Sequence, residues 1–293
     1  MQLIRHFMAD DARRAALNAL TRQTFGFDFE KWYAAGYWEG DYLPYAFEEN
    51  GRLIANVSVN RMRFLLDGQE RCFVQLGTVM TDPAYRGRGL ASALMREAMA
   101  DAAGSCEGVY LFGDLGALPF YDKLGFHRAL QYRYTLRPGV LGAPPAPESC
   151  FAPVDPADPA VRARYAQAVR GAAPCAALEH LNRFSLTMFY TAGMKRVHYC
   201  ADLDFFAVLA REDDTLVVQG VFGAQRVPLR DVLARIITDA PTLRLGFAPL
   251  PQDAGLFDAR PYDGGDDYRL FTLGGALDAI PAQKLYFPEL SHA

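Results

Sequence analysis

The stretch VMTDPAYRGRGLASALM, residues 79–95, decides the fold of the first half of this chain. It ends a predicted strand, turns through the sequence RGRG at residues 86–89, and enters an apolar helix that Gly104 stops. Glycines let the backbone approach a ligand closely, and the first N–H groups of a helix have no partner within that helix. Because Arg86 and Arg88 add positive charge, the turn predicts a site for an anion such as a pyrophosphate.

Two other nucleotide-binding motifs do not fit this turn. A Walker loop requires Gly-Lys-Ser or Gly-Lys-Thr, which the sequence lacks here. A dinucleotide-binding turn would use Gly87, Gly89 and Ser92, but it needs a βαβ unit and an acidic residue at the end of the next strand. Here hairpins precede the turn, and the nearest acid, Glu107, opens the next strand. We therefore reject both motifs.

The elements around the turn predict an α+β fold with a mixed, mostly antiparallel sheet flanked by helices. Hairpins are predicted at Asn50-Gly51 and Asp67-Gly68. The apolar residues between them change parity, which predicts a β-bulge near Asn60 or Arg61. We expect helices at 10–24, 29–37, 90–103 and 117–124, and strands at 73–80, 109–112 and 130–136.

The second half repeats this order in outline. Seven prolines lie between Arg137 and Pro159, so we predict a first unit at 1–136, a Pro-rich linker at 137–159 and a smaller α+β unit at 160–293. In place of the Gly-rich turn, the second unit has GAQRVP at 223–228, with a single glycine. Its predicted helices are 161–170, 178–188 and 229–238, and its strands are 205–210, 216–222, 243–247 and 268–273.

Composition excludes several classes of protein. The chain has 293 residues, 51% hydrophobic and 22% charged, which is incompatible with wholesale disorder. A net charge of −4 argues against nucleic acid or an anionic membrane as the main partner. Since no run of 18 apolar residues and no signal peptide is evident, we expect a cytoplasmic protein. The five cysteines contain no CxxC pair, so neither a disulfide framework nor a metal site is predicted.

Two motifs together resemble the GNAT superfamily of acyl-CoA-dependent N-acetyltransferases. Arg86, Gly89 and Ala91 meet the pattern Arg/Gln-x-x-Gly-x-Gly/Ala between a strand and a helix. The segment ALPFYDKLGF at 117–126 is similar to the family's A-x-x-F-Y-x-K-x-G-F motif at the expected spacing. The resemblance covers residues 1–136. The second unit matches in element order alone, which suggests a degenerate GNAT-like domain.

The resemblance implies roles for particular residues. Backbone groups of Val79 and Thr81 would pair with the pantetheine arm of acetyl-CoA, and Tyr121 would protonate the departing thiolate. Asp114 departs from the family's usual asparagine at that position. The residues implied to hold the pyrophosphate are Arg86, Gly87, Arg88, Gly89, Leu90 and Ala91.

The residue types suit acyl transfer, although the general base stays open. A phenol with an ordinary pKa of about 10 stays protonated at neutral pH and can give its proton to a thiolate. Candidates for the base are Glu39, Asp41, Asp114 and a water chain. Longer relatives that acetylate aminoglycosides insert a chain-terminal carboxylate into the active site, which would here involve Ala293 or His292; a packed, inert end is the simpler interpretation.

Aromatic residues between Phe29 and Tyr45 could form a wall that holds a cationic amine, and ordinary core packing explains them equally well.

The sequence therefore predicts an acetyl-CoA-dependent N-acetyltransferase that transfers the acetyl group directly to a primary amine of a small molecule or protein in a ternary complex. No metal, nucleic acid or membrane is expected to take part, and the protein is a possible homo-oligomer. The second unit would shape the acceptor cleft or mediate subunit contact without binding cofactor. The alternative is a non-catalytic acyl-CoA-binding or regulatory module, which would not need Tyr121.

Overall fold

The first helix lies within one residue of its predicted range of 10–24 at each end. In the computed structural model, which describes residues 1–142, 150–236 and 238–293, α1 spans Asp11–Phe25. The Asp10 side chain accepts a hydrogen bond from the backbone N–H of Arg13 at 3.1 Å, and Gly26 closes the helix with φ of 79°. Leu17 and Leu20 are buried against the first sheet.

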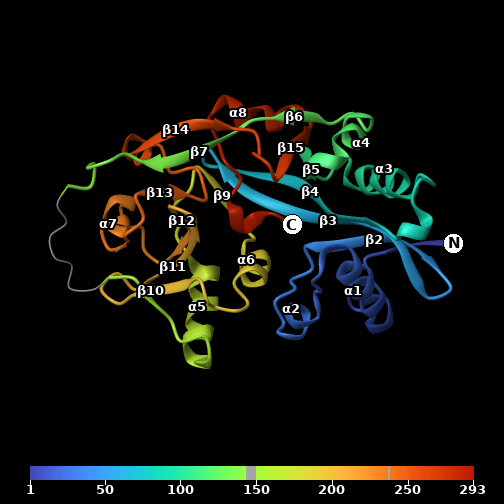
Figure 1. Cartoon of the computed structure of the whole chain (residues 1–293), viewed down its shortest axis with the longest axis horizontal. Helices are drawn as coiled ribbons and strands as arrows, with labels where there is room; N and C mark the ends of the chain where they lie inside the picture. The colour runs from blue at the N-terminus through green and yellow to red at the C-terminus, as the bar shows by residue number, and fades with distance from the viewer. Residues whose placement is uncertain (143–149, 237) are drawn as a thin grey trace.

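A first sheet carries the predicted anion-binding turn. Its strand order is β1-β2-β3-β4-β5-β15-β6, with β9 paired to the far end of β3. Helices α1 and α2 (Glu30–Ala34) cover one face, and α3 (Leu90–Ala102) and α4 (Leu118–Asp122) cover the other (Figure 1). The strands are β1 (Gln2–Arg5), β2 (Tyr42–Glu49), β3 (Arg52–Leu66), β4 (Gln69–Thr81), β5 (Gly108–Asp114), β6 (His127–Ala129), β9 (Leu178–His180) and β15 (Tyr268–Leu273).

A second sheet has the order β14-β7-β13-β12-β11-β10-β8. Its strands are β14 (Phe257–Tyr262), β7 (Gln131–Leu136), β13 (Thr242–Leu245), β12 (Thr215–Phe222), β11 (Phe205–Glu212), β10 (Val197–Cys200) and β8 (Ala152–Pro153). The helices of this half are α5 (Pro159–Gly171), α6 (Phe184–Tyr190), α7 (Leu229–Leu233) and α8 (Ala279–Ala282). Short 3₁₀ turns span Pro83–Tyr85, Leu115–Ala117, Ala254–Leu256, Gly275–Asp278 and Glu289–Ser291.

Both sheets follow one plan, which confirms the predicted fold class. Among the described residues each sheet has one parallel pair, β4 with β5 and β12 with β13, and all its other neighbouring strands are antiparallel. The chain is thus an α+β protein with two mostly antiparallel sheets flanked by helices.

The predicted first unit gives β7 to the second sheet, and the predicted second unit gives β15 and β9 to the first. Strand β15 lies between β5 and β6, and β7 lies in the corresponding place between β13 and β14. The predicted division into 1–136 and 160–293 stays a prediction. The predicted linker 137–159 includes residues 143–149, which lie outside the described residues.

The parity change in β3 does not mark a bulge at Asn60 or Arg61. Strand β3 pairs with β4 without interruption from Ser58 to Leu66, and the register shift lies instead between Asn56 and Ser58. There Val57 of β3 faces two residues, Thr78 and Val79, so the extra residue belongs to β4. Asn56, Ser58 and Asn60 are themselves buried, and they lie on the face that becomes apolar from Met62 onward. The parity change therefore indicates a row of buried polar side chains and not a bulge.

Both predicted hairpin turns are confirmed, at residues 50–51 and 67–68. The predicted helix 178–188 is wrong at its start, because Leu178–His180 pairs with the end of β3 as strand β9. Within the described part of the chain, the search for a helix long and apolar enough to span a bilayer finds none.

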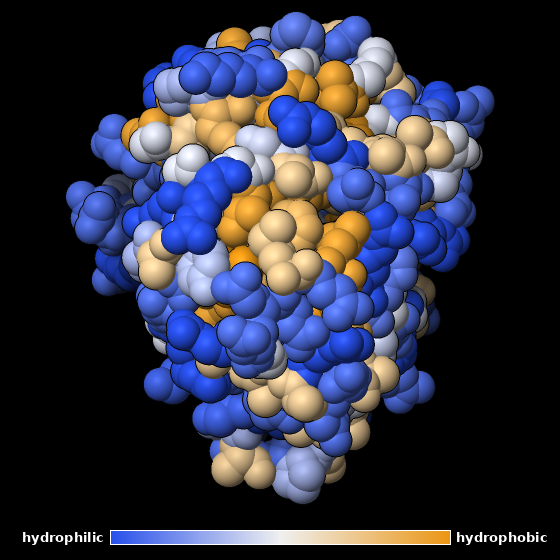
Figure 2. All heavy atoms as spheres, turned by 90° about the vertical axis from the view of Figure 1, so that its right-hand side faces the viewer, coloured by the Kyte–Doolittle hydropathy of each residue, from blue (hydrophilic) through white to orange (hydrophobic). Residues whose placement is uncertain are grey.

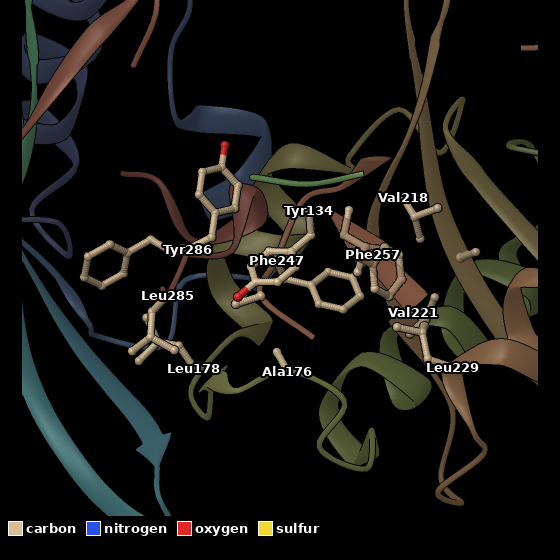
Figure 3. Close-up of a cluster of buried hydrophobic side chains, with 14 of the residues drawn as sticks. Tyr134, Ala176, Leu178, Val218, Val221, Leu229, Phe247, Phe257, Leu285 and Tyr286 are labelled. Atoms are coloured by element: carbon tan, nitrogen blue, oxygen red, sulfur yellow. The ribbon is translucent and has the colours of Figure 1, made fainter. Parts of the chain in front are cut away.

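A large apolar core joins the two halves. Strands of the second sheet, Leu178 of β9 and residues 285–287 near the C-terminus all contribute to it. Figure 3 shows Leu285 and Tyr286 among side chains such as Leu178, Tyr134 and Phe247. The C-terminal segment, by which we mean residues 285–293, therefore packs as part of the fold.

Candidate active site

The centre of the site is a gap between β4 and β5. The two strands pair in parallel at Phe73–Gly108, Val74–Val109 and Gln75–Tyr110. Beyond that point β4 continues to Thr81 beside β3, and β5 continues to Asp114 beside β15. At the bulge Thr78 adopts the left-handed conformation with φ of 48°, which is uncommon for a β-branched residue. One edge of each strand is therefore left to face the gap.

The anion-binding turn follows directly from the far end of β4. Residues 86–89 are exposed, and Gly87 and Gly89 take φ values of 76° and 75°, which favour glycine. The first intrahelical bond of α3 runs from Ala93 N–H to the Gly89 carbonyl, so the N–H groups of residues 90–92 precede it. The turn is thus open to a ligand, with the positive end of a 13-residue helix behind it.

The two arginines of the turn, Arg86 and Arg88, contact residues just before the turn. The guanidinium of Arg88 lies over the ring of Tyr85 at 4.7 Å and donates to the carbonyl of Ala84 at 3.1 Å. The Nε of Arg86 donates to the carbonyl of Thr81 at 3.4 Å. Neither contact uses a carboxylate, and both side chains remain largely exposed, so their charge is available to an anion.

Tyr121 lies on the α3 and α4 side of the first sheet. Its ring packs on Gly113 of β5, where a Cβ would lie 2.6 Å from the ring atom Cε2, and it contacts Phe271 of β15 with ring centroids 5.2 Å apart. The side chain is 6% exposed. Burial, with a smaller contribution from the charge of Asp114, raises the pKa of Tyr121 to about 12. The phenol is therefore protonated at neutral pH.

The opposite face of the sheet at the same gap is polar and is covered by the C-terminal segment. Phe287 stacks on Tyr110 of β5 at 4.1 Å, and His292 stacks on Phe112 at 3.8 Å. A Cβ at Gly77 of β4 would lie 2.6 Å from the carbonyl carbon of Ala293, so only glycine fits. The segment therefore reaches the gap from the face opposite Tyr121.

A hydrogen-bond network holds the bulge on this second face. The Tyr42 hydroxyl lies 3.2 Å from the Thr78 hydroxyl and accepts from Ser58 at 2.8 Å. The side-chain amide of Asn56 donates to the Thr78 carbonyl at 2.9 Å. Burial raises the pKa of Tyr42 to about 12, which keeps this hydroxyl a donor. Tyr42 and Asn56 thus hold Thr78, and Ser58 links these two side chains.

A small cavity of about 10 Å³, with room for about one water molecule, adjoins this network between the two units. Asp41 lines it, and burial raises the pKa of that carboxyl. Its walls include Trp32, Tyr42, Asn60 and His180. Most of the aromatic residues between Phe29 and Tyr45 belong to the buried core near α2, and Trp32 and Tyr42 alone among them line the cavity.

The predicted site residues come together at one edge of the first sheet. Val79 and Thr81 lie on the strand that borders the gap, and residues 86–91 form the turn beyond it. Tyr121 of α4 packs against β5 across the gap. Of the proposed bases, Asp41 lies at the cavity, Asp114 is exposed near Tyr121, and Glu39 forms an ion pair with Arg170. Sequence reasoning missed Gln75, Gly77, Gly113 and Phe271.

No group of three His, Cys, Asp or Glu side chains that could hold a metal ion is found in the part of the chain that the structure describes.

The exposed surface near this edge is not uniformly polar. Figure 2 views the side on which α3 and α4 lie in Figure 1, and it shows apolar residues gathered within a mostly hydrophilic face. Leu115, which precedes α4, is 38% exposed.

Comparison with known proteins agrees with this geometry. The model of the acetyltransferase (GNAT) family matches residues 13–126, which contain the gap, the turn and Tyr121. Among curated proteins none matches the chain. Similar solved structures are a conserved protein of unknown function from Enterococcus faecalis V583 described as a probable N-acyltransferase, a GCN5-related N-acetyltransferase from Kribbella flavida, and Eis1 from Mycobacterium abscessus.

These three structures share the fold at low identity. Identities are 15%, 16% and 15%, with TM-scores of 0.55, 0.54 and 0.54. Each alignment covers 92% of this chain and 71%, 71% and 73% of the other chains. The likeness therefore extends across both sheets. The family model identifies residues 13–126 as a GNAT acetyltransferase domain, and the shared fold extends beyond it over the second sheet.

Proposed function

We propose that this protein is an N-acetyltransferase that moves the acetyl group of acetyl-CoA to a primary amine of a small molecule or protein within a ternary complex. The observation that carries the proposal is the gap beyond Gln75 and Tyr110, with Tyr121 on one face of the sheet and an exposed RGRG turn at its outer end. A strand-shaped opening that leads to an anion site suits a pantetheine arm with a pyrophosphate.

In this proposal each part of acetyl-CoA has its own residues. The backbone N–H groups of residues 87–91, with Arg86 and Arg88, hold the pyrophosphate. The backbone of Val79 and Thr81 pairs with the pantetheine arm along the free edge of β4. The thioester then lies near the bulge at Thr78, between Tyr121 and the C-terminal segment.

The reaction follows from these positions. A neutral amine nitrogen attacks the thioester carbonyl carbon, and a C–N bond forms as the C–S bond breaks. The nitrogen loses a proton to a base, and the thiolate sulfur gains one from the Tyr121 hydroxyl. Because burial keeps that phenol protonated, Tyr121 is a suitable acid at neutral pH.

Asp41, which lines the small cavity beside the bulge, is proposed as the base that takes the proton from the amine. Since burial raises the pKa of the Asp41 carboxyl, this group accepts a proton more readily than an exposed aspartate does. Asp114, Glu39, a water chain, Ala293 and His292 remain alternatives. Burial lowers the pKa of His292 to about 4, so its imidazole is neutral. A cytoplasmic location and a homo-oligomeric state also stay predictions.

The second candidate function is a non-catalytic acyl-CoA-binding module. A thiol-release assay with acetyl-CoA and a panel of amines separates the two, since an enzyme releases free CoA and a sensor only binds it. Tyr121→Phe removes only the hydroxyl and should reduce turnover while leaving CoA affinity nearly unchanged. CoA binding without turnover for every amine would favour the sensor, and absence of CoA binding would refute both candidates.

A further inference from the structure

The second sheet contains a copy of the gap that forms the candidate site. Strands β12 and β13 pair in parallel and stop at Val218–Leu245. Strand β12 has a bulge at that point, because Val208 pairs with Gly220 and Leu209 with Val218. Gln219 is therefore the extra residue, directly after the last parallel pair, whereas the bulge of β4 at Thr78 lies three residues beyond its last parallel pair. The two units share both features of the site, a bulge and a gap beside it.

In the second unit this gap holds the C-terminal segment. The backbone N–H of Gly246 donates to the Val218 carbonyl, and the backbone N–H of Glu289 donates to the Gly246 carbonyl, both at 2.8 Å. The Glu289 carboxylate accepts from Arg244 at 2.6 Å and from the Gln219 side chain at 3.1 Å. The C-terminal segment thus fills the gap of the second sheet, whereas the gap of the first sheet is free for a ligand.

The ion pair in this gap is well shielded from water. The side chains of Arg244 and Glu289 are 7% and 14% exposed. Arg244 also contacts Glu212 at 2.7 Å, so one arginine serves two carboxylates. A buried pair with complete hydrogen bonding fixes geometry more firmly than an exposed pair does.

Four residues after Glu289, the same segment reaches the first sheet. Tyr190 of α6 donates to the His292 carbonyl at 2.6 Å. In the orientation that satisfies its neighbours, the Gln75 amide accepts from the Ala293 N–H at 2.7 Å and donates to the Ser291 carbonyl at 2.8 Å. Gln75 is the last residue of β4 that pairs with β5. The segment therefore touches both gaps within five residues.

We propose that Arg244 and Glu289 are positioning residues for the acetyltransferase site. By binding Glu289, the gap of the second unit anchors the chain, and this anchor places residues 291–293 against Gly77 and the bulge of β4. The inference rests on the proposed function. In this proposal the second unit fixes one wall of the first unit's site. Because Glu289 occupies the gap of the second sheet, that gap has no room for the pantetheine arm of an acyl-CoA.

The test uses the full chain with Glu289→Gln. Glutamine keeps the size and an oxygen acceptor but removes the charge that pairs with Arg244. We expect amide hydrogen exchange of residues 289–293 to become at least about tenfold faster, because a charge-assisted bond is weakened. Turnover should fall about tenfold, while the KM for acetyl-CoA changes less than about twofold, since the anchor touches no cofactor-binding residue.

Two comparisons make the result specific. Arg137→Gln is the matched control, because Arg137 pairs with Asp258 on the same sheet at 3.0 Å with both side chains about half exposed. It should change neither exchange nor turnover. Arg244→Gln leaves the carboxylates of Glu212 and Glu289 without their cation and risks unfolding, so Glu289→Gln carries the test.

Unchanged exchange in Glu289→Gln overturns the anchor. Faster exchange with unchanged turnover, or a KM that rises as much as turnover falls, overturns the positioning role. If the wild-type protein has no turnover with any amine, the proposed function fails, and the positioning role fails with it. The exchange experiment then still decides whether the ion pair anchors the segment.

Discussion

Gly113 should set the position of the proposed acid, and substitution by alanine tests this directly. An alanine Cβ at residue 113 would lie 2.6 Å and 2.8 Å from two ring carbons of Tyr121 and 3.2 Å from Phe271. Carbon atoms in contact are ordinarily about 3.5 to 4.0 Å apart. Since Phe271 backs the ring at a centroid distance of 5.2 Å, the Tyr121 ring has to move by about 1 Å along the gap.

The size of the effect follows from that displacement. A shift of about 1 Å in a catalytic group costs roughly 100-fold in rate, so Gly113→Ala should lower turnover by about that factor. Overpacking of this kind costs about 1 to 3 kcal/mol of folding free energy. For a chain of this length, that loss lowers the melting temperature by only about 2 to 5 °C. The variant should therefore be folded but nearly inactive.

The assay compares steady-state turnover, CoA affinity by calorimetry and thermal unfolding. Gly116→Ala is the matched control, because a Cβ there meets nothing within 4 Å and its φ is not positive. The double variant Gly113→Ala/Tyr121→Phe should be no slower than Tyr121→Phe alone if Gly113 acts through the hydroxyl. Wild-type turnover in Gly113→Ala, or strict additivity in the double variant, would refute the reasoning.

Three further outcomes are expected. Arg88→Ala should weaken CoA binding about tenfold by removing a charge-assisted phosphate contact, and acetyl-pantetheine, which lacks the pyrophosphate, should be used equally well by variant and wild type. Burial raises the pKa of Tyr121 to about 12, so the phenol should stay protonated up to pH 11. A pH–rate profile from 8 to 11 should therefore show no loss of wild-type turnover with a pKa near 10, and such a loss that is absent in Tyr121→Phe would contradict this. Burial lowers the pKa of His180 to about 3, so its contribution to stability is complete above pH 6.5 and is lost as pH falls toward 3. Urea unfolding should show about 3 kcal/mol less acid destabilisation between pH 7 and 4 in His180→Phe than in wild type, and an equal loss would contradict this.

Local signals in the sequence were enough to predict most helices and turns of the first unit. The first helix, the two hairpin turns and the glycine-rich turn each depend on a few neighbouring residues, so their prediction needs no knowledge of packing. Strand β9 was missed because Leu178–His180 is strand only through its pairing with Phe64–Leu66, more than a hundred residues earlier. The exchange of β7 and β15 depends in the same way on tertiary contacts.

In the candidate site too, local motifs were predicted and residues that act through tertiary contacts were missed. The turn and Tyr121 carry motifs that can be read in order, whereas Gly113 and Phe271 matter only because they meet the Tyr121 ring. One long-range feature did leave a trace in the sequence. The parity change in β3 marks the buried row of Asn56 and Ser58, and a burial-aware interpretation would have placed a polar site there rather than a bulge.

The strand exchange makes both walls of the proposed site depend on the second half of the chain. Strand β15, which follows nearly all of the second unit, pairs with β5 along the whole stretch from Val109 to Asp114 and supplies Phe271 behind Tyr121. The C-terminal segment then covers the opposite face of the same gap. Both walls of the proposed site thus depend on residues beyond 267, although residues 13–126 alone match the family. A second unit whose own gap is filled by Glu289 contributes to the proposed catalysis by holding these two walls in place.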